Sequence, residues 1–106
     1  MRLNQLLQRL EYTCLQGRMD IEVAEIINDS RKAKEGSLFF CIRGAVTDGH
    51  KYAKEVAEKG AAVLIVEEPV DVPEHTTVIQ VADTRYAMAL ISAAWYGYPA
   101  EEMKII

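Results

Sequence analysis

The stretch from Gly44 to Lys51 nearly matches the pattern of a phosphate-binding loop, GxxxxGK followed by Ser or Thr. In that pattern the lysine contacts the β- and γ-phosphates and the hydroxyl holds Mg²⁺. Here His50 occupies the lysine position and Lys51 the hydroxyl position, so we exclude ATP hydrolysis by this segment. What remains is a turn with exposed amides before a helix, which suits a polar or anionic ligand. The alternative is a plain strand-to-helix connection with two turn glycines.

A second polar turn, Asn28-Asp29-Ser30-Arg31, follows the apolar pair that ends at Ile27. It offers an amide, a hydroxyl and a guanidinium within four residues, a mixture that recognises the edge of a base or a phosphate oxygen. The alternative is a purely structural turn. In that case Asp29 and Ser30 bind nearby backbone groups while Arg31 pairs with a surface acid.

The remaining reactive side chains lack a recognisable catalytic arrangement. His50 has no nucleophile or orienting carboxylate in a recognisable pattern around it, so we expect it to start a helix and make a backbone hydrogen bond. The acids Asp83, Glu67 and Glu68 show no paired spacing for acid-base chemistry. The aromatic residues near the end of the chain are expected to pack in the core and at a hinge; they are Trp95, Tyr96 and Tyr98.

The two cysteines, Cys14 and Cys41, are not spaced as a CxxC pair. We expect both to be buried small apolar residues, because a cytoplasmic α/β domain of this size needs no disulfide. The two histidines, His50 and His75, are scattered along the chain, so no metal site is predicted.

The overall composition indicates one ordinary globular domain. The 106 residues are 50% hydrophobic and 26% charged, and they carry a formal net charge of −4. The acidic balance and dispersed basic residues argue against nucleic-acid binding. The apolar runs fall far short of the roughly 20 residues that cross a bilayer, and the N-terminus lacks a signal-peptide block. We therefore expect a cytoplasmic protein without a membrane partner.

Alternating strands and helices must position the two polar turns. Leucines at helical spacing predict a short amphipathic helix over residues 3–10, and the mixed residues 12–27 predict two short strands or a hairpin. Three apolar runs predict buried strands over residues 38–42, 62–66 and 76–81. A helix is expected to begin after Asp48 and to end at Gly60, and another to run from its N-cap Asp83 to Gly97.

This order predicts an α/β fold, a three-layer domain with a mixed, largely parallel sheet flanked by helices. In such a sheet, ligands bind at the carboxyl ends of the strands, which is where both polar turns fall. Residues 67–75, with two prolines and several acids, are predicted to be a surface loop of no special function.

The motifs DSR (29–31), GSLFFCIRG (36–44), DGH (48–50) and WYGYP (95–99) together resemble the N-terminal domain of the Mur ligases. Their order and separation are similar to those of the synthetases that add the third amino acid to UDP-N-acetylmuramoyl-dipeptide. Ligases that attach the terminal dipeptide share much of this pattern but more often carry Thr in place of Ser30. The resemblance covers essentially the whole chain.

The resemblance implies roles for the two turns. Asn28 and Ser30 would contact the uridine diphosphate of the substrate, and Ala45, Val46 and Thr47 would line the uracil, largely through backbone groups. By the same comparison, structural or supporting roles fall to four residues: Asp29, Arg31, Asp48 and His50.

The resemblance also implies that residues 1–106 are a UDP-MurNAc-binding domain whose catalytic partners are the central and C-terminal domains of the same polypeptide. ATP, Mg²⁺ and a carbamylated lysine would belong to those domains, so this stretch would need no cofactor and would have no ligase activity alone. Two alternatives remain open. One is an F-type Mur ligase, the type that attaches the terminal dipeptide, and the other is a free-standing α/β binding module. A GKT or GKS segment encoded downstream of Ile106 would favour a ligase, and a stop codon would favour the module.

Overall fold

The computed structural model describes residues 2–42 and 49–96. In chain order its elements are α1 (Leu3–Leu6), β1 (Thr13–Gln16), β2 (Glu25–Ile27), the 3-10 turn η1 (Ser30–Lys32), β3 (Ser37–Phe40), the 3-10 turn η2 (Gly49–Tyr52), α2 (Ala53–Glu58), β4 (Val63–Val66), β5 (Thr77–Gln80) and α3 (Thr84–Trp95).

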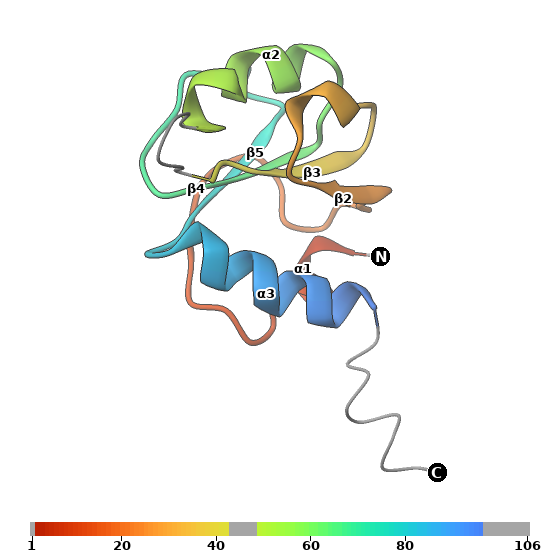
Figure 1. Ribbon diagram of the computed structural model, residues 1–106, viewed down its shortest axis with the longest axis vertical. Helices are drawn as coiled ribbons and strands as arrows, with labels where there is room; N and C mark the ends of the chain where they lie inside the picture. The colour runs from red at the N-terminus through yellow and green to blue at the C-terminus, as the bar shows by residue number, and fades with distance from the viewer. Residues whose placement is uncertain (1, 43–48, 97–106) are drawn as a thin grey trace, which may run out of the picture.

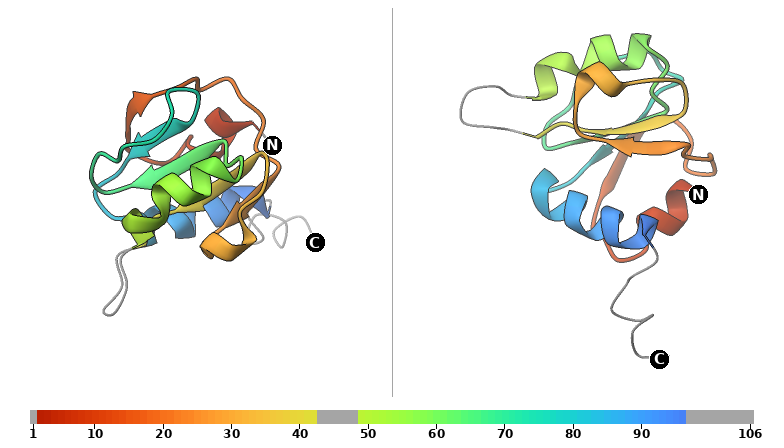
Figure 2. Two further views of the ribbon diagram at one scale, coloured as in Figure 1. Left: turned by 90° about the horizontal axis from the view of Figure 1, so that it is seen from above. Right: turned by 45° about the vertical axis from the view of Figure 1, so that its right-hand side comes forward.

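The strands form one sheet in the order β1-β5-β4-β3-β2. The four strands from β2 to β5 are parallel, and β1 joins β5 antiparallel at one edge. Helices α1 and α3 cover one face of the sheet, whereas α2 and the two 3-10 turns lie on the other (Figures 1 and 2). The predicted three-layer fold with a mixed, largely parallel sheet is confirmed.

Strand β3 shows why the sheet needs cover on both faces. Its neighbouring side chains alternate between two cores: Leu38 and Phe40 pack toward α1 and α3, whereas Phe39 packs toward α2. All four of its residues are buried. Burying one such side chain contributes about 1.5–3 kcal/mol, so the continuous apolar run is stable only between two helical layers.

The ends of the two longer helices follow the sequence signals. The Asp83 carboxylate accepts hydrogen bonds from the backbone N–H groups of Arg85 and Tyr86, which confirms the predicted N-cap of α3. Helix α2 is followed by Gly60 with φ of 103°, a left-handed conformation that ends the helix as predicted. The cap predicted for Asp48 falls outside the described residues. Within residues 2–42 and 49–96, no helix is both long and apolar enough to cross a bilayer.

Several sequence predictions for the edges of the fold are wrong. Cys14 is exposed because β1 is an edge strand without a covering helix, whereas Cys41 is buried as expected. The N-terminal helix ends at Leu6, although the leucines of its apolar stripe are all buried. Tyr96 is 67% exposed and not packed in the core, while Trp95 packs against the core cluster. Tyr98 lies outside the described residues.

Candidate functional site

A hollow of about 650 Å³ lies beyond the carboxyl ends of β2 and β3. We call it the β2–β3 hollow. It is lined by the whole polar turn 28–31, by Phe39, Phe40 and Ile42 from β3 and its continuation, and by Gly49, Tyr52 and Glu55 from η2 and α2. The 28–31 turn therefore lines this hollow, and the stretch from Gly44 to Lys51 reaches it through its described residue Gly49.

In the 28–31 turn, Asp29 and Arg31 bind each other. The Asp29 carboxylate accepts hydrogen bonds from the Arg31 backbone N–H and Nε, at 2.9 and 3.1 Å, and from Nη2 at 2.9 Å. The Arg31 guanidinium and then its backbone N–H lower the pKa of Asp29 to about 2. The acid paired with Arg31 is therefore Asp29 itself, and the structural roles expected for the two residues remain predictions.

The two other polar side chains of the turn, Ser30 and Asn28, have different contacts. Within the described residues the Ser30 hydroxyl makes no hydrogen bond, and the Ser30 carbonyl accepts one from Lys59 Nζ at 3.1 Å. Asn28 Nδ2 contacts the Met88 sulfur of α3 at 3.8 Å. The hydroxyl of Ser30 can therefore bind a ligand without breaking a contact. The Asn28 side chain, in contrast, already contacts helix α3, which covers the other face of the sheet from α2.

The Asp29 carboxyl is expected to titrate near pH 2. Because its pKa is lower in the folded chain than the ordinary 3.8, the ionised pair stabilises the turn above about pH 4, and this stabilisation is lost as pH falls through about 2. Arg31→Gln should raise the pKa but leave it below 3.8, because the backbone hydrogen bond of residue 31 remains. Carbon-13 NMR of the carboxyl groups measures both values. A wild-type pKa of 3.8 or more would contradict the pairing.

The backbone of Gly49 is hydrogen-bonded to a residue just after β3. Its N–H donates to the Ile42 carbonyl at 2.8 Å, which joins the two ends of the intervening segment. A Cβ at residue 49 would lie 2.8 Å from Ile42 N and 3.1 Å from the Cys41 carbonyl carbon, so only glycine fits here. The predicted uracil-lining residues Ala45, Val46 and Thr47 lie outside the described residues, as does Asp48.

His50 lies beside Gly49 and is 9% exposed. Its Nε2 accepts a hydrogen bond of 2.9 Å from the backbone N–H of Glu67, at the end of β4. The predicted helix-start histidine with a backbone hydrogen bond is confirmed. An Nε2 that accepts this bond carries no proton, so the imidazole serves here as a structural acceptor.

Five residues that line the β2–β3 hollow were not predicted as site residues: Phe39, Phe40, Ile42, Tyr52 and Glu55. The two phenylalanines fall in the predicted strand over residues 38–42, and Tyr52 falls in the helix predicted between Asp48 and Gly60, but nothing local in the sequence places them beside the 28–31 turn. Tyr52 ends η2 and Glu55 lies in the first turn of α2, and this spacing of three helical positions is the signal that could have grouped them. Together they give the hollow an apolar floor with one carboxylate at its rim.

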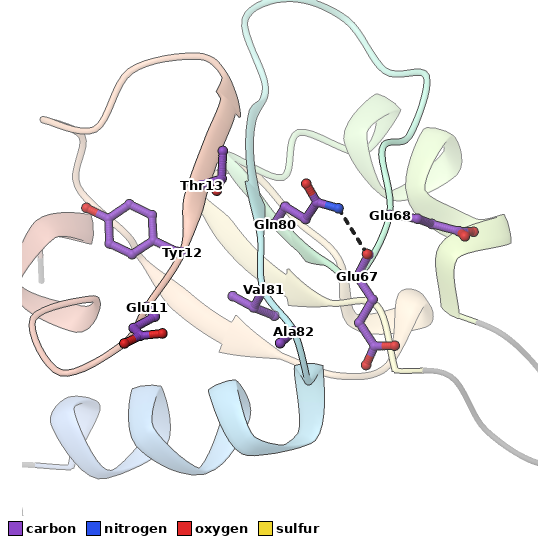
Figure 3. A pocket seen from close by; sticks show the side chains of 8 residues that line it. All are labelled: Glu11, Tyr12, Thr13, Glu67, Glu68, Gln80, Val81 and Ala82. Atoms are coloured by element: carbon purple, nitrogen blue, oxygen red, sulfur yellow. Dashed lines mark hydrogen bonds between the residues drawn. The ribbon is translucent and has the colours of Figure 1, made fainter.

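Residues 67–75 were predicted to have no special function, but Glu67 has four hydrogen-bonding contacts. It lines a second hollow beyond β4 and β5, together with the acids Glu11 and Glu68 (Figure 3). Three carboxylates around this hollow would repel a diphosphate. An anionic ligand therefore fits the β2–β3 hollow better. Within the described ranges, no group of three His, Cys, Asp or Glu side chains is placed to hold a metal ion.

The fold is an α/β domain with a hollow at the carboxyl ends of its parallel strands, the place where ligands bind in open sheets of this class. A family model described as "Mur ligase family, catalytic domain" matches residues 22–96, and the chain belongs to the Mur ligase family.

Among its relatives, the UDP-N-acetylmuramoyl-L-alanyl-D-glutamate–2,6-diaminopimelate ligases of Clostridioides difficile (strain 630) and Clostridium botulinum are 42% and 44% identical to it. Both matches cover 100% of this chain and 22% of the relative, so the chain spans about a fifth of their length. A crystal structure of MurF from Acinetobacter baumannii has a TM-score of 0.77 at 31% identity, covering 88% of this chain and 20% of that one. The resemblance stated from the sequence motifs is confirmed.

Proposed function

We propose that this chain binds the uridine diphosphate end of UDP-N-acetylmuramoyl-L-alanyl-D-glutamate, as the first domain of an ATP-dependent ligase that adds the third amino acid of the peptidoglycan stem peptide. The observation that carries the proposal is the β2–β3 hollow, where the 28–31 turn lies beside both ends of the segment 43–48. The full ligase would act in the cytoplasm, where its nucleotide substrates are found.

The lining of the hollow supports a nucleotide ligand. Tyr52, which is half-buried beside the 28–31 turn, offers apolar surface for the flat uracil ring, and the Ser30 hydroxyl offers a donor for ribose or phosphate oxygens. In the proposal, Asn28 joins Ser30, and the backbone of Ala45, Val46 and Thr47 lines the uracil. Asp29, Arg31, Asp48 and His50 hold these groups in place without contacting the ligand.

The identities favour a ligase for the third amino acid over one for the terminal dipeptide. The diaminopimelate ligases are 42% and 44% identical to the chain, whereas the MurF structures are 31% or 32% identical. The names of the first group make diaminopimelate the amino acid that the whole protein would add. The chain would share this reaction with central and C-terminal domains of the same polypeptide.

ATP and Mg²⁺ do not fit the described part of this chain. The phosphate-binding pattern lacks its lysine and hydroxyl, because His50 and Lys51 occupy those positions. The described residues also offer no cluster of oxygen ligands for a metal ion. We therefore assign both to the remainder of the ligase and expect no ligase activity from the 106 residues alone.

Titrating the chain with UDP, followed by amide NMR, tests the proposal. We expect signals around residues 28–31 and 42–49 to shift, and ADP, with its larger base, to shift them far less. Ser30→Ala should weaken UDP binding about two- to tenfold, the effect of losing one hydrogen bond worth roughly 0.5–1.5 kcal/mol. Ser92→Ala, on α3 outside this hollow, is the matched control and should bind normally. Absence of any UDP-dependent shift in these residues would overturn the proposed function.

A further inference from the structure

Helix α3 contacts both halves of the candidate site, which are the 28–31 turn and the pair Gly49–His50. It does so through residues one helical turn apart. Thr84, its first residue, binds Glu67, which in turn binds His50 next to Gly49. Met88, four residues later, contacts Asn28 of the polar turn. Residues four apart on a helix lie on the same face, about 5–6 Å apart at Cβ, so one side of α3 reaches both halves.

The first of these connections is a continuous chain of hydrogen bonds. The Glu67 carboxylate accepts from the backbone N–H and the hydroxyl of Thr84, both at 2.9 Å. The backbone N–H of Glu67 donates to His50 Nε2 at 2.9 Å. The Glu67 carbonyl accepts from Gln80 Nε2 at 3.1 Å, the bond drawn in Figure 3. Glu67 thereby joins the carboxyl ends of β4 and β5 to η2 and to the start of α3. Bonds to a carboxylate are about twice as strong as neutral ones, so this link is stiff.

The second connection is weaker but directional. Asn28 Nδ2 donates to the Met88 sulfur at 3.8 Å, and a thioether is a weak acceptor. Met88 is partly buried against the same core as Phe40, so its side chain is held in place by packing. The contact therefore favours one orientation of the exposed Asn28 amide beside the β2–β3 hollow.

The body of α3 is rigid enough to link the two contacts. It is capped by Asp83, and Ala87, Ile91 and Ala94 bury its inner face against the sheet. We propose that α3 holds the two parts of the ligand site at a fixed separation, and we call this role the brace. In this proposal Thr84 and Met88 are positioning residues that set the distance between the 28–31 turn and the residues Gly49 and His50. This inference rests on the proposed function, because it concerns how that site is held in shape.

Four variants of the chain test the brace. Thr84→Val removes the hydroxyl bond to Glu67 with little change of shape, and Met88→Leu removes the sulfur but keeps apolar packing. We expect each to raise the Kd for UDP about three- to tenfold, as expected for the loss of one positioning hydrogen bond. His50→Ala should do the same. His50→Gln should restore binding, since the glutamine oxygen can accept from the Glu67 N–H at the position of Nε2.

Arg85→Gln is the matched control, because Arg85 is an exposed neighbour on α3 that lines neither hollow. It should leave the Kd unchanged. A contact that only stabilises the fold would lower the melting temperature but leave the Kd for UDP, measured well below that temperature, unchanged. Normal UDP affinity in Thr84→Val and Met88→Leu would therefore overturn the brace.

Hydrogen exchange without ligand separates this inference from the proposed function. The Gly49 amide, which donates to Ile42, should exchange faster in Thr84→Val and His50→Ala than in the wild type or in Arg85→Gln. If the wild type does not bind UDP, the proposed function fails, while faster Gly49 exchange would still support the coupling. Unchanged Gly49 exchange in both variants would overturn the brace whether or not UDP binds.

Discussion

Gly49→Ala is expected to weaken UDP binding at least tenfold and to lower the free energy of unfolding by about 1–3 kcal/mol, the cost of overpacking a tight site. The new Cβ would lie 2.8 Å from the Ile42 nitrogen and 3.1 Å from both Cα and the carbonyl carbon of Cys41. These are backbone atoms of the segment that continues β3, and they cannot rotate away as a side chain could. The two ends of the segment 43–48 must therefore separate, which lengthens the 2.8 Å bond from Gly49 N–H to Ile42.

Urea denaturation and a UDP titration measure the two effects of Gly49→Ala. Lys54→Ala is the control, because Lys54 is an exposed residue of the helical segment that follows and alanine there meets no backbone atom. The account requires that Gly49→Ala lose affinity even under conditions where it is fully folded. Wild-type affinity together with wild-type stability would show that the close approach of these backbones is not required for the site.

Phe40→Ala is expected to lower the free energy of unfolding by about 3–5 kcal/mol, a large part of the 5–15 kcal/mol typical of a domain. Phe40 is 2% exposed and packs in the core between the sheet and helices α1 and α3. It also lines the β2–β3 hollow and the neighbouring hollow that contains Met88. Its loss would leave a cavity beneath both Asn28 and its helix contact, so UDP binding should be lost as well.

Chemical denaturation followed by circular dichroism measures this change. Phe40→Leu keeps most of the apolar volume and should cost less than half as much. Tyr86→Ala removes an aromatic ring that is 61% exposed, and surface substitutions of this kind usually change stability by no more than about 0.5 kcal/mol. A loss below 1 kcal/mol for Phe40→Ala would contradict the place of this ring in the core.

The sequence was most informative where burial or a local cap determines the structure. Apolar runs without alternation predicted the central strands because both faces of β3 and β4 are covered. Asp83 predicted the start of α3 because a cap acts within three residues. The wrong prediction for Cys14 has the opposite cause. Its burial depends on whether β1 is central or at the edge, and this is decided by pairing with β5, more than 60 residues later.

The same distinction holds for the candidate site. Asp29 and Arg31 are two residues apart, so the turn alone predicts that Asp29 binds nearby backbone and that Arg31 pairs with an acid, although not that the acid is Asp29. Asn28 and Met88 are 60 residues apart, and His50 and Glu67 are 17 apart. No local pattern marks such contacts, because they arise only when the sheet brings the ends of its strands together. For this reason Glu67 was placed in a loop of no special function.

Contacts between bound UDP and the chain test the central claim most directly, namely that residues 28–31 and the segment closed by Gly49 and Ile42 form one uridine site. Nuclear Overhauser effects from the uracil H5 and H6 protons can be measured on the labelled chain. We predict that they reach residues of both stretches, including Ser30 and at least one of Ala45, Val46 and Thr47. Effects confined to other residues, such as Tyr12 and Gln80, which line the second hollow beyond β4 and β5, would contradict the account.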